Sequence, residues 1–155
     1  MSNSEMKQRL HDDMTAALKA RDDLRKSTLR MALTAVTKAE VAGKEARELS
    51  DAEIIEVLTA EAKKRRESVT AYREAGREEL ALKEQAEADI LAEYLPEQLT
   101  AEEITALVTE TIAATGAAEL GPRGIGKVMG ALQPKVKGKA DGGTVSAEVK
   151  RQLGA

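Results

Sequence analysis

The fold of this chain is decided by residues 90–103, which read ILAEYLPEQLTAEE. Proline disfavours helical geometry in the residue before it, so a helix that reaches Leu95 must end before Pro96. Thr100 and Glu103 then have the spacing of a capping box, in which the threonine accepts from the glutamate amide and the glutamate reaches back. The sequence therefore predicts a break between two helical regions at Pro96.

Upstream of the break, apolar residues recur at helical spacing in four stretches. In the first stretch, Met6, Leu10, Met14 and Leu18 recur every fourth residue, and we expect them to face a core. We predict one helix from about residue 3 to residue 20, a second from Asp22 or Asp23 to Gly43, and a third from Ser50 to Gly76. The fourth carries Leu80 and Leu95 on its apolar face and ends at Pro96. We expect an N-terminal four-helix domain over residues 1–95.

Downstream of the break, the helices become shorter and the joints between them richer in glycine. Residues 116–143 contain eight of the eleven glycines and two of the three prolines. The predicted helices begin at the Thr100 capping box, cover residues 125–132, and run from about residue 144 to residue 153. We therefore expect an all-α fold whose second part is a small C-terminal three-helix domain, residues 96–155.

The composition supports helices and excludes several classes of protein. Hydrophobic residues make up 42% of the chain, yet it contains no Phe, no Trp and no Cys. Cores built from Leu, Ile, Val, Met and Ala favour helices, and a chain without cysteine has no disulfide or thiolate site. No apolar run is long enough to span a membrane, and the first ten residues do not resemble a signal peptide. We expect a cytoplasmic protein without a membrane partner.

The residues that carry chemistry do not form a recognisable catalytic centre. His11 is the only histidine and lies beside two aspartates, a pattern that supports neither a catalytic triad nor a zinc site. The glycine-rich stretch at residues 121–127 lacks the spacing of a phosphate-binding P-loop, because Val128 follows Lys127. We predict no catalytic residues, no metal site and no cofactor, and a solvated His11.

One segment is purely basic. Residues 120–140 contain no acid and five cations, namely Arg123, Lys127, Lys135, Lys137 and Lys139. Such a segment either contacts a nucleic-acid backbone or is a solvated turn, and the pattern leaves both readings open. Because aromatic residues are nearly absent, stacking on single-stranded bases is disfavoured, and any RNA partner is expected to be a folded one.

A second charged feature is expected to be structural. Arg65 falls on the apolar stripe of its predicted helix, and Glu87 falls on the stripe of the next one. If the turn at Gly76 folds these helices back on each other, the two side chains come level. We predict that they form a partly buried ion pair.

Five segments together resemble the YqeY-like protein family. They are TLRMAL at residues 28–33, REAGREEL at 73–80, ILAEYLPEQL at 90–99, GKVMGAL at 126–132 and KGKADG at 137–142. This family is similar to the C-terminal helical and tail region of GatB, a component of the aspartyl/glutamyl-tRNA amidotransferase. The resemblance implies a two-part all-α fold, a hinge at residues 94–96, and tRNA contacts at residues 126–129 and 137–139.

The resemblance also frames the expected function. The 155 residues have no counterpart of the catalytic region of GatB, so we do not expect the isolated chain to catalyse amide transfer. We expect a non-catalytic module that binds tRNA or assists a tRNA-dependent amidotransferase. One alternative is a protein-interaction module that docks on a tRNA-charging enzyme, an amidotransferase or another partner. A second is a carbon–nitrogen ligase with glutamine as amide donor.

Overall fold

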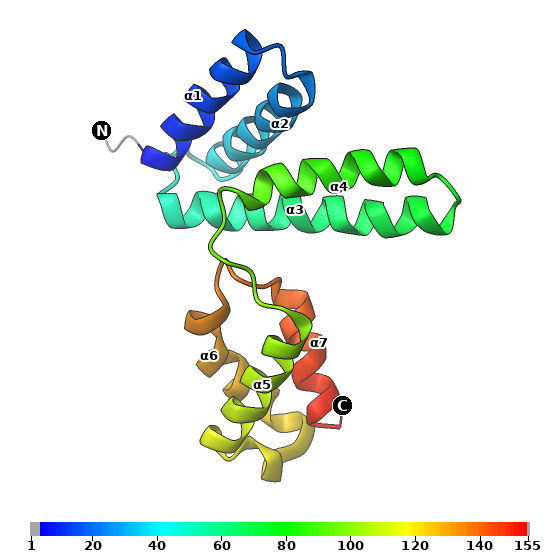
Figure 1. Ribbon diagram of the computed structural model, residues 1–155. Helices are drawn as coiled ribbons and strands as arrows, with labels where there is room; N and C mark the ends of the chain where they lie inside the picture. The colour runs from blue at the N-terminus through cyan, green and yellow to red at the C-terminus, as the bar shows by residue number, and fades with distance from the viewer. Residues whose placement is uncertain (1–3, 155) are drawn as a thin grey trace. The chain divides into compact units, whose positions relative to one another are not determined.

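The computed structural model describes residues 4–154, and this part of the chain is helical without any strand (Figure 1). The all-α expectation is therefore confirmed. The chain divides into two compact units, residues 1–95 and 96–155. The helices are α1 (Glu5–Lys19), α2 (Asp23–Glu40), α3 (Asp51–Glu74), α4 (Glu78–Ala92), α5 (Ala101–Thr115), the 3-10 helix η1 (Ala117–Gly124), α6 (Ile125–Val136) and α7 (Gly142–Gln152).

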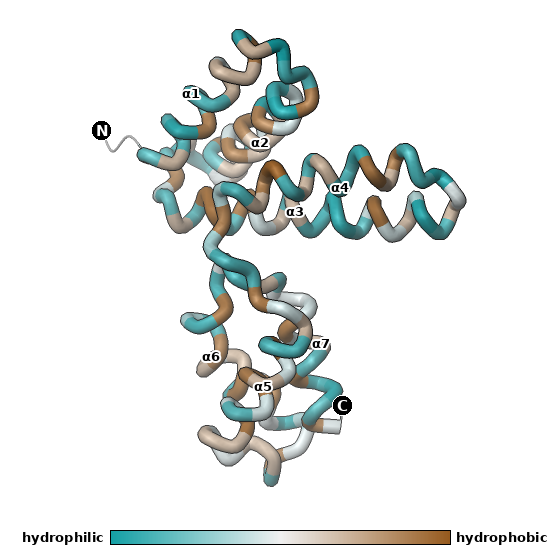
Figure 2. The backbone as a smooth tube through the Cα atoms, viewed as in Figure 1, coloured by the Kyte–Doolittle hydropathy of each residue, from teal (hydrophilic) through white to brown (hydrophobic). Residues whose placement is uncertain are grey.

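In the N-terminal unit, α3 and α4 form a long hairpin whose far end extends beyond α1 and α2 (Figure 1). Gly76 makes the turn with a φ of +73°, a backbone region that favours glycine. Apolar and polar residues alternate along these helices (Figure 2), so each buries one face. The fully buried side chains at the centre are Leu10, Leu29, Val36, Ile54, Leu58 and Leu91.

Two of the helix starts follow directly from local sequence. Ser50 and Glu53 form the predicted capping box of α3, and Thr100 and Glu103 form that of α5. In each box the Ser or Thr side chain accepts from the glutamate amide, which satisfies a backbone donor that the helix leaves unpaired. The expected start of the first helix at residue 3 lies outside the described residues; α1 begins at Glu5.

The apolar stripe predicted for α1 is wrong at its last residue. Leu18 is 57% exposed, whereas Ala17 is 3% exposed and packs inside. A spacing of four residues advances about 400° around a helix, so each step turns the side chain by about 40°. Over three steps from Met6, the stripe has turned away from the core.

The C-terminal unit has its own core, whose fully buried members are Val108, Ala117, Val128, Leu132, Val145 and Val149. The stretch between α5 and α6, which the glycine pattern predicts to be a simple joint, forms η1. Helix α6 also continues four residues past its predicted end, because Val136 is buried in this core.

Tyr94, which the family resemblance places at the hinge, belongs to the core of the N-terminal unit. Its ring lies under the guanidinium of Arg9, 4.4 Å from the ring centroid, and its hydroxyl donates to the carboxylate of Asp13. This side chain therefore fastens the end of α4 to α1, and the two compact units divide after Leu95.

Candidate functional site

We call residues 120–140 the basic segment. Arg123 lies in η1, Lys127 in the first turn of α6 and Lys135 in its last turn, while Lys137 and Lys139 occupy the loop that follows. All five side chains are exposed. Eight residues of helix separate Lys127 from Lys135, which corresponds to about 12 Å along the axis and about 80° around it. These two lysines therefore point to the same side of α6.

The loop after α6 is held in place by residues that follow Pro96, where the two compact units divide. The Gln98 side-chain amide donates to the carbonyl oxygens of Pro96, at 2.8 Å, and of Gly138, at 2.7 Å. The Leu99 amide donates to the Lys139 carbonyl oxygen at 2.8 Å. Gly138 is buried and has a φ of +76°. Lys137 and Lys139 therefore project from a fixed backbone. Sequence reasoning missed Gln98, because its partner lies 40 residues away.

The exposed face of α6 carries two glycines that internal packing does not require. A Cβ added at Gly126 or at Gly130 would meet no atom within 4 Å. Glycine inside a helix costs about 1 kcal/mol relative to alanine. Gly124, two residues earlier, is different: a Cβ there would lie 2.9 Å from the Ala117 carbonyl oxygen. The two open glycines leave the α6 backbone accessible beside Lys127.

Two acids of the C-terminal unit have contacts within or beside α7. The Asp141 carboxylate accepts from the amide and the hydroxyl of Thr144, at 2.9 and 3.0 Å, and so caps α7. Hydrogen bonds from Arg151 and Gln152 lower the pKa of Glu148 to about 2. Arg151 is thus neutralised within α7, and the basic segment holds the unit's concentrated positive charge.

The pair Arg65 and Glu87 lies in the hairpin of the N-terminal unit. Arg65 Nε is 3.1 Å from Glu87 Oε2, and the two side chains are 10% and 8% exposed. The Nε–H does not point at the carboxylate, so the contact is an ion pair without an aligned hydrogen bond. Glu61 Oε2 lies 3.3 Å from Arg65 Nη1, and Glu84 Oε2 lies 3.9 Å from Nε. One buried cation therefore serves three carboxylates.

This imbalance sets the protonation of Glu87. Burial raises the pKa of Glu87, and the charge of Glu84 raises it further, against the opposing effect of Arg65. Desolvation thus disfavours the charged form of Glu87, and the attraction of Arg65, which is shared with two other carboxylates, does not fully offset this cost. We interpret the cluster as structural.

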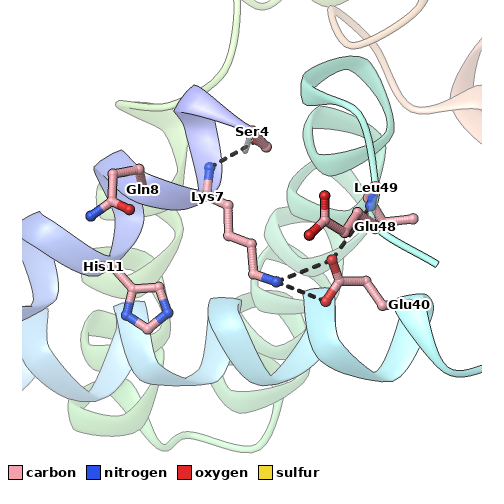
Figure 3. Close-up of a pocket in the computed structure, with 7 residues that line it drawn as sticks. All are labelled: Ser4, Lys7, Gln8, His11, Glu40, Glu48 and Leu49. Atoms are coloured by element: carbon pink, nitrogen blue, oxygen red, sulfur yellow. Dashed lines mark hydrogen bonds and ion pairs between the residues drawn. The ribbon is translucent and has the colours of Figure 1, made fainter. Parts of the chain in front are cut away.

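The hollow around His11 is small, and Lys7 and Glu40 form an ion pair within it (Figure 3). Lys7 Nζ lies 2.9 and 3.1 Å from the two carboxylate oxygens of Glu40, and this bond lowers the pKa of Glu40. His11 is exposed, and no hydrogen bond within residues 4–154 joins it to Ser4 or Glu40. The arrangement provides no nucleophile held by a base.

Neither a metal site nor a membrane span is found in the described part of the chain. Between residues 4 and 154, no three His, Asp or Glu side chains are grouped closely enough to hold a metal ion. Over the same residues, no helix combines the length and the apolar character needed to cross a membrane.

Fold and site together define a class: an all-helical protein of two compact units, with an exposed basic segment on the second. A family model described as "Yqey-like protein" matches residues 7–153, and the chain belongs to this family. It is also similar to a fungal protein named "Altered inheritance of mitochondria protein 41, mitochondrial", from Pyrenophora tritici-repentis (strain Pt-1C-BFP). The two are 30% identical over 150 residues, which cover 95% of this chain and 80% of the relative. That name places the relative in mitochondria; a cytoplasmic location of this chain stays a prediction.

Proposed function

We propose that this chain is a non-catalytic accessory protein that binds folded tRNA through its basic segment, alone or beside a tRNA-dependent amidotransferase. The observation that carries the proposal is the exposure of all five cations of the basic segment, with no acid among residues 120–140. Phosphate contacts of this kind supply sequence-independent affinity for nucleic acid.

The positions of the charged residues support the proposal more strongly than the net charge does. Residues 96–155 contain seven Lys and Arg and seven Asp and Glu, so their net charge is zero. Five of the seven cations belong to the basic segment. A neutral unit with clustered cations presents a local positive potential that attracts a polyanion.

The kind of contact follows from the side chains that are present. Residues 96–155 contain no aromatic side chain on which a base could stack. The open glycines of α6 allow a phosphate backbone to approach close to the helix, and Lys127 lies beside them. We therefore propose recognition of the shape and backbone of a folded RNA rather than of base edges.

The proposal also assigns the two compact units as separate domains, a four-helix domain over residues 1–95 and a three-helix domain over residues 96–155. Each has its own core. Fragments with these limits should each give a helical circular-dichroism spectrum and a cooperative thermal transition. A fragment 96–155 that stays unfolded while the whole chain melts in one step would contradict separate domains.

The test of tRNA binding is a mobility-shift titration with folded tRNA over a salt series. The variant K135E/K137E/K139E should bind at least about tenfold more weakly at low salt, and its slope against log salt should fall by about 2–3. The matched control, K19E/K44E/R66E, makes the same change of charge on exposed residues of the N-terminal unit and should bind like wild type. No shift at low salt, or equal loss in both variants, would refute the proposal.

Catalysis needs its own assay. We expect no glutamine-dependent ammonia release from the purified chain, with or without tRNA. Ammonia production above the buffer rate by the chain alone would revive the carbon–nitrogen ligase alternative.

A further inference from the structure

A groove of about 590 Å³ runs between α2 and α3 in the N-terminal unit, away from the basic segment in sequence. Its lining combines apolar and basic side chains. The apolar lining includes Met31, Ala35, Val57 and Ala60, and the basic lining includes Arg30 and Lys38 from α2 and Lys64 from α3. Met31 is 46% exposed, so its thioether side chain is accessible from solvent.

The groove is positive within an acidic unit. Residues 1–95 contain seventeen Lys and Arg against twenty Asp and Glu, a net charge of −3. The groove is lined by four cations and one acid, Glu61. Glu61 lies 3.2 Å from Lys64 and 3.3 Å from Arg65. Arg30 and Lys38 have no carboxylate partner among residues 4–154. A local positive groove in a negative unit selects an acidic ligand.

Arg65 provides an anchor in the wall of the groove. Its Nη1 lies 3.3 Å from Glu61 and its Nε lies 3.1 Å from Glu87 without an aligned hydrogen bond, while its Nη2 contacts the sulfur of Met31, at 3.8 Å. A thioether is a weak acceptor, so this guanidinium retains donor capacity next to the groove. A carboxylate that displaces the Met31 sulfur would gain a charge-assisted hydrogen bond in a largely desolvated place.

We propose that this groove binds an acidic amphipathic helix of a partner protein. Arg30, Thr34 and Lys38 follow one another at four-residue spacing, which gives a row about 12 Å long, or two helical turns. A bound helix with acids beside an apolar stripe would place that stripe on Met31 and Val57 and its acids on Arg30, Lys38 and Lys64. An RNA backbone would use the cations but leave the apolar lining unburied, so the observations favour a peptide.

The test uses the full chain and three labelled peptides of equal length. The first is an acidic amphipathic helix of Glu and Leu, the second replaces every Glu by Lys, and the third scatters the same residues so that no apolar stripe forms. Fluorescence anisotropy should give a Kd of about 1–100 µM for the first peptide and at least tenfold weaker binding for the others. Amide chemical shifts should change on α2 and α3.

The variant R30E/K38E should weaken binding of the acidic peptide at least about tenfold, whereas the control K19E/R66E should stay within about twofold. Equal circular-dichroism spectra of both variants ensure that folding is not the cause. No saturable binding of the acidic peptide, equal binding of the scattered peptide, or indifference to R30E/K38E would overturn the proposal. So would tRNA-induced shifts confined to α2 and α3, or a dimer of the chain that R30E/K38E dissociates. Loss of tRNA binding in K135E/K137E/K139E is independent of all these outcomes.

Discussion

The two units of this protein use the same charged residue types in different ways. In the N-terminal unit, some ion pairs join different helices or their ends: Lys7 to Glu40, Arg65 to Glu87, and Arg25 to Glu93 at 2.9 Å. In the C-terminal unit, the Glu148–Arg151 pair stays within α7, and the basic segment gathers exposed cations without acids between them. Part of the charge in the first unit therefore links its helices, whereas the second unit gathers exposed cations in one segment.

The largest expected effect comes from breaking the charge cluster of the N-terminal unit. Arg65→Met should lower the free energy of unfolding by about 3–5 kcal/mol, because it leaves three carboxylates near one buried position. Glu87→Gln should cost about 1 kcal/mol or less, since Arg65 retains Glu61 and Glu84 and the lost charge was already disfavoured. Urea titration measures the free energy of unfolding of both variants. Equal losses would show that Arg65 and Glu87 contribute equally to stability, which would contradict the prediction.

The second prediction contrasts neighbouring glycines in the C-terminal unit. Gly124→Ala should destabilise the chain by about 1–3 kcal/mol, because the new methyl group meets the Ala117 carbonyl. Gly126→Ala and Gly130→Ala should each stabilise it by about 0.5–1 kcal/mol, as alanine favours the helix. If the open face of α6 meets RNA, these two stabilised variants should nevertheless bind tRNA more weakly. Unchanged tRNA affinity would separate the glycines from the contact.

The third prediction concerns pH and two carboxylates of the N-terminal unit. The folded pKa of Glu40 is lowered from 4.5, so its contribution is present above pH 4.5 and lost as pH falls through the folded pKa. The folded pKa of Glu87 is raised, so stabilisation by its protonated form is present below pH 4.5 and lost as pH rises through the folded pKa. Acidification from pH 7 to pH 4 should therefore reduce the amount by which the free energy of unfolding of wild type exceeds that of Glu40→Gln. The same change should raise the free energy of unfolding of wild type relative to that of Glu87→Gln. Each change should be about 1 kcal/mol, measured by chemical unfolding at both pH values.

The smallest expected effect tests whether Gln98 positions the basic segment of the C-terminal unit. Gln98→Leu removes the hydrogen bond to the Gly138 carbonyl without changing any charge. It should weaken tRNA binding about two- to fivefold, because Lys137 and Lys139 lose part of their fixed backbone. The slope against log salt should stay that of wild type, since all five cations remain. A changed slope would mean that Gln98 does more than position the loop.

Local signals predicted the helices well where the decisive groups lie within one turn. The capping boxes at Ser50 and Thr100 belong to this kind, because each needs only residues of its own first turn. Helix α4, by contrast, ends at Ala92, short of the predicted stop at Pro96. The prediction was wrong at Leu18, because a spacing of four residues drifts around the helix. It also missed η1, in which Gly124 packs against Ala117.

The candidate sites also differ in whether their residues are close together in the sequence. The basic segment is continuous in sequence and could be found by counting charges. Gln98 could not, because its partner Gly138 is brought to it by the fold. The groove between α2 and α3 also escaped, because Met31 and Val57 look like ordinary core residues until the packing shows which sides of their helices stay uncovered.

The enclosure of Tyr94 gives this protein a built-in spectroscopic reporter. The chain has no tryptophan and two tyrosines, so its ultraviolet absorption and emission come from very few rings. Burial and the hydrogen bond to Asp13 raise the pKa of Tyr94, so the phenolate is disfavoured while α1 stays packed on the end of α4. An alkaline absorbance titration should therefore contain a late step that coincides with the loss of helical ellipticity.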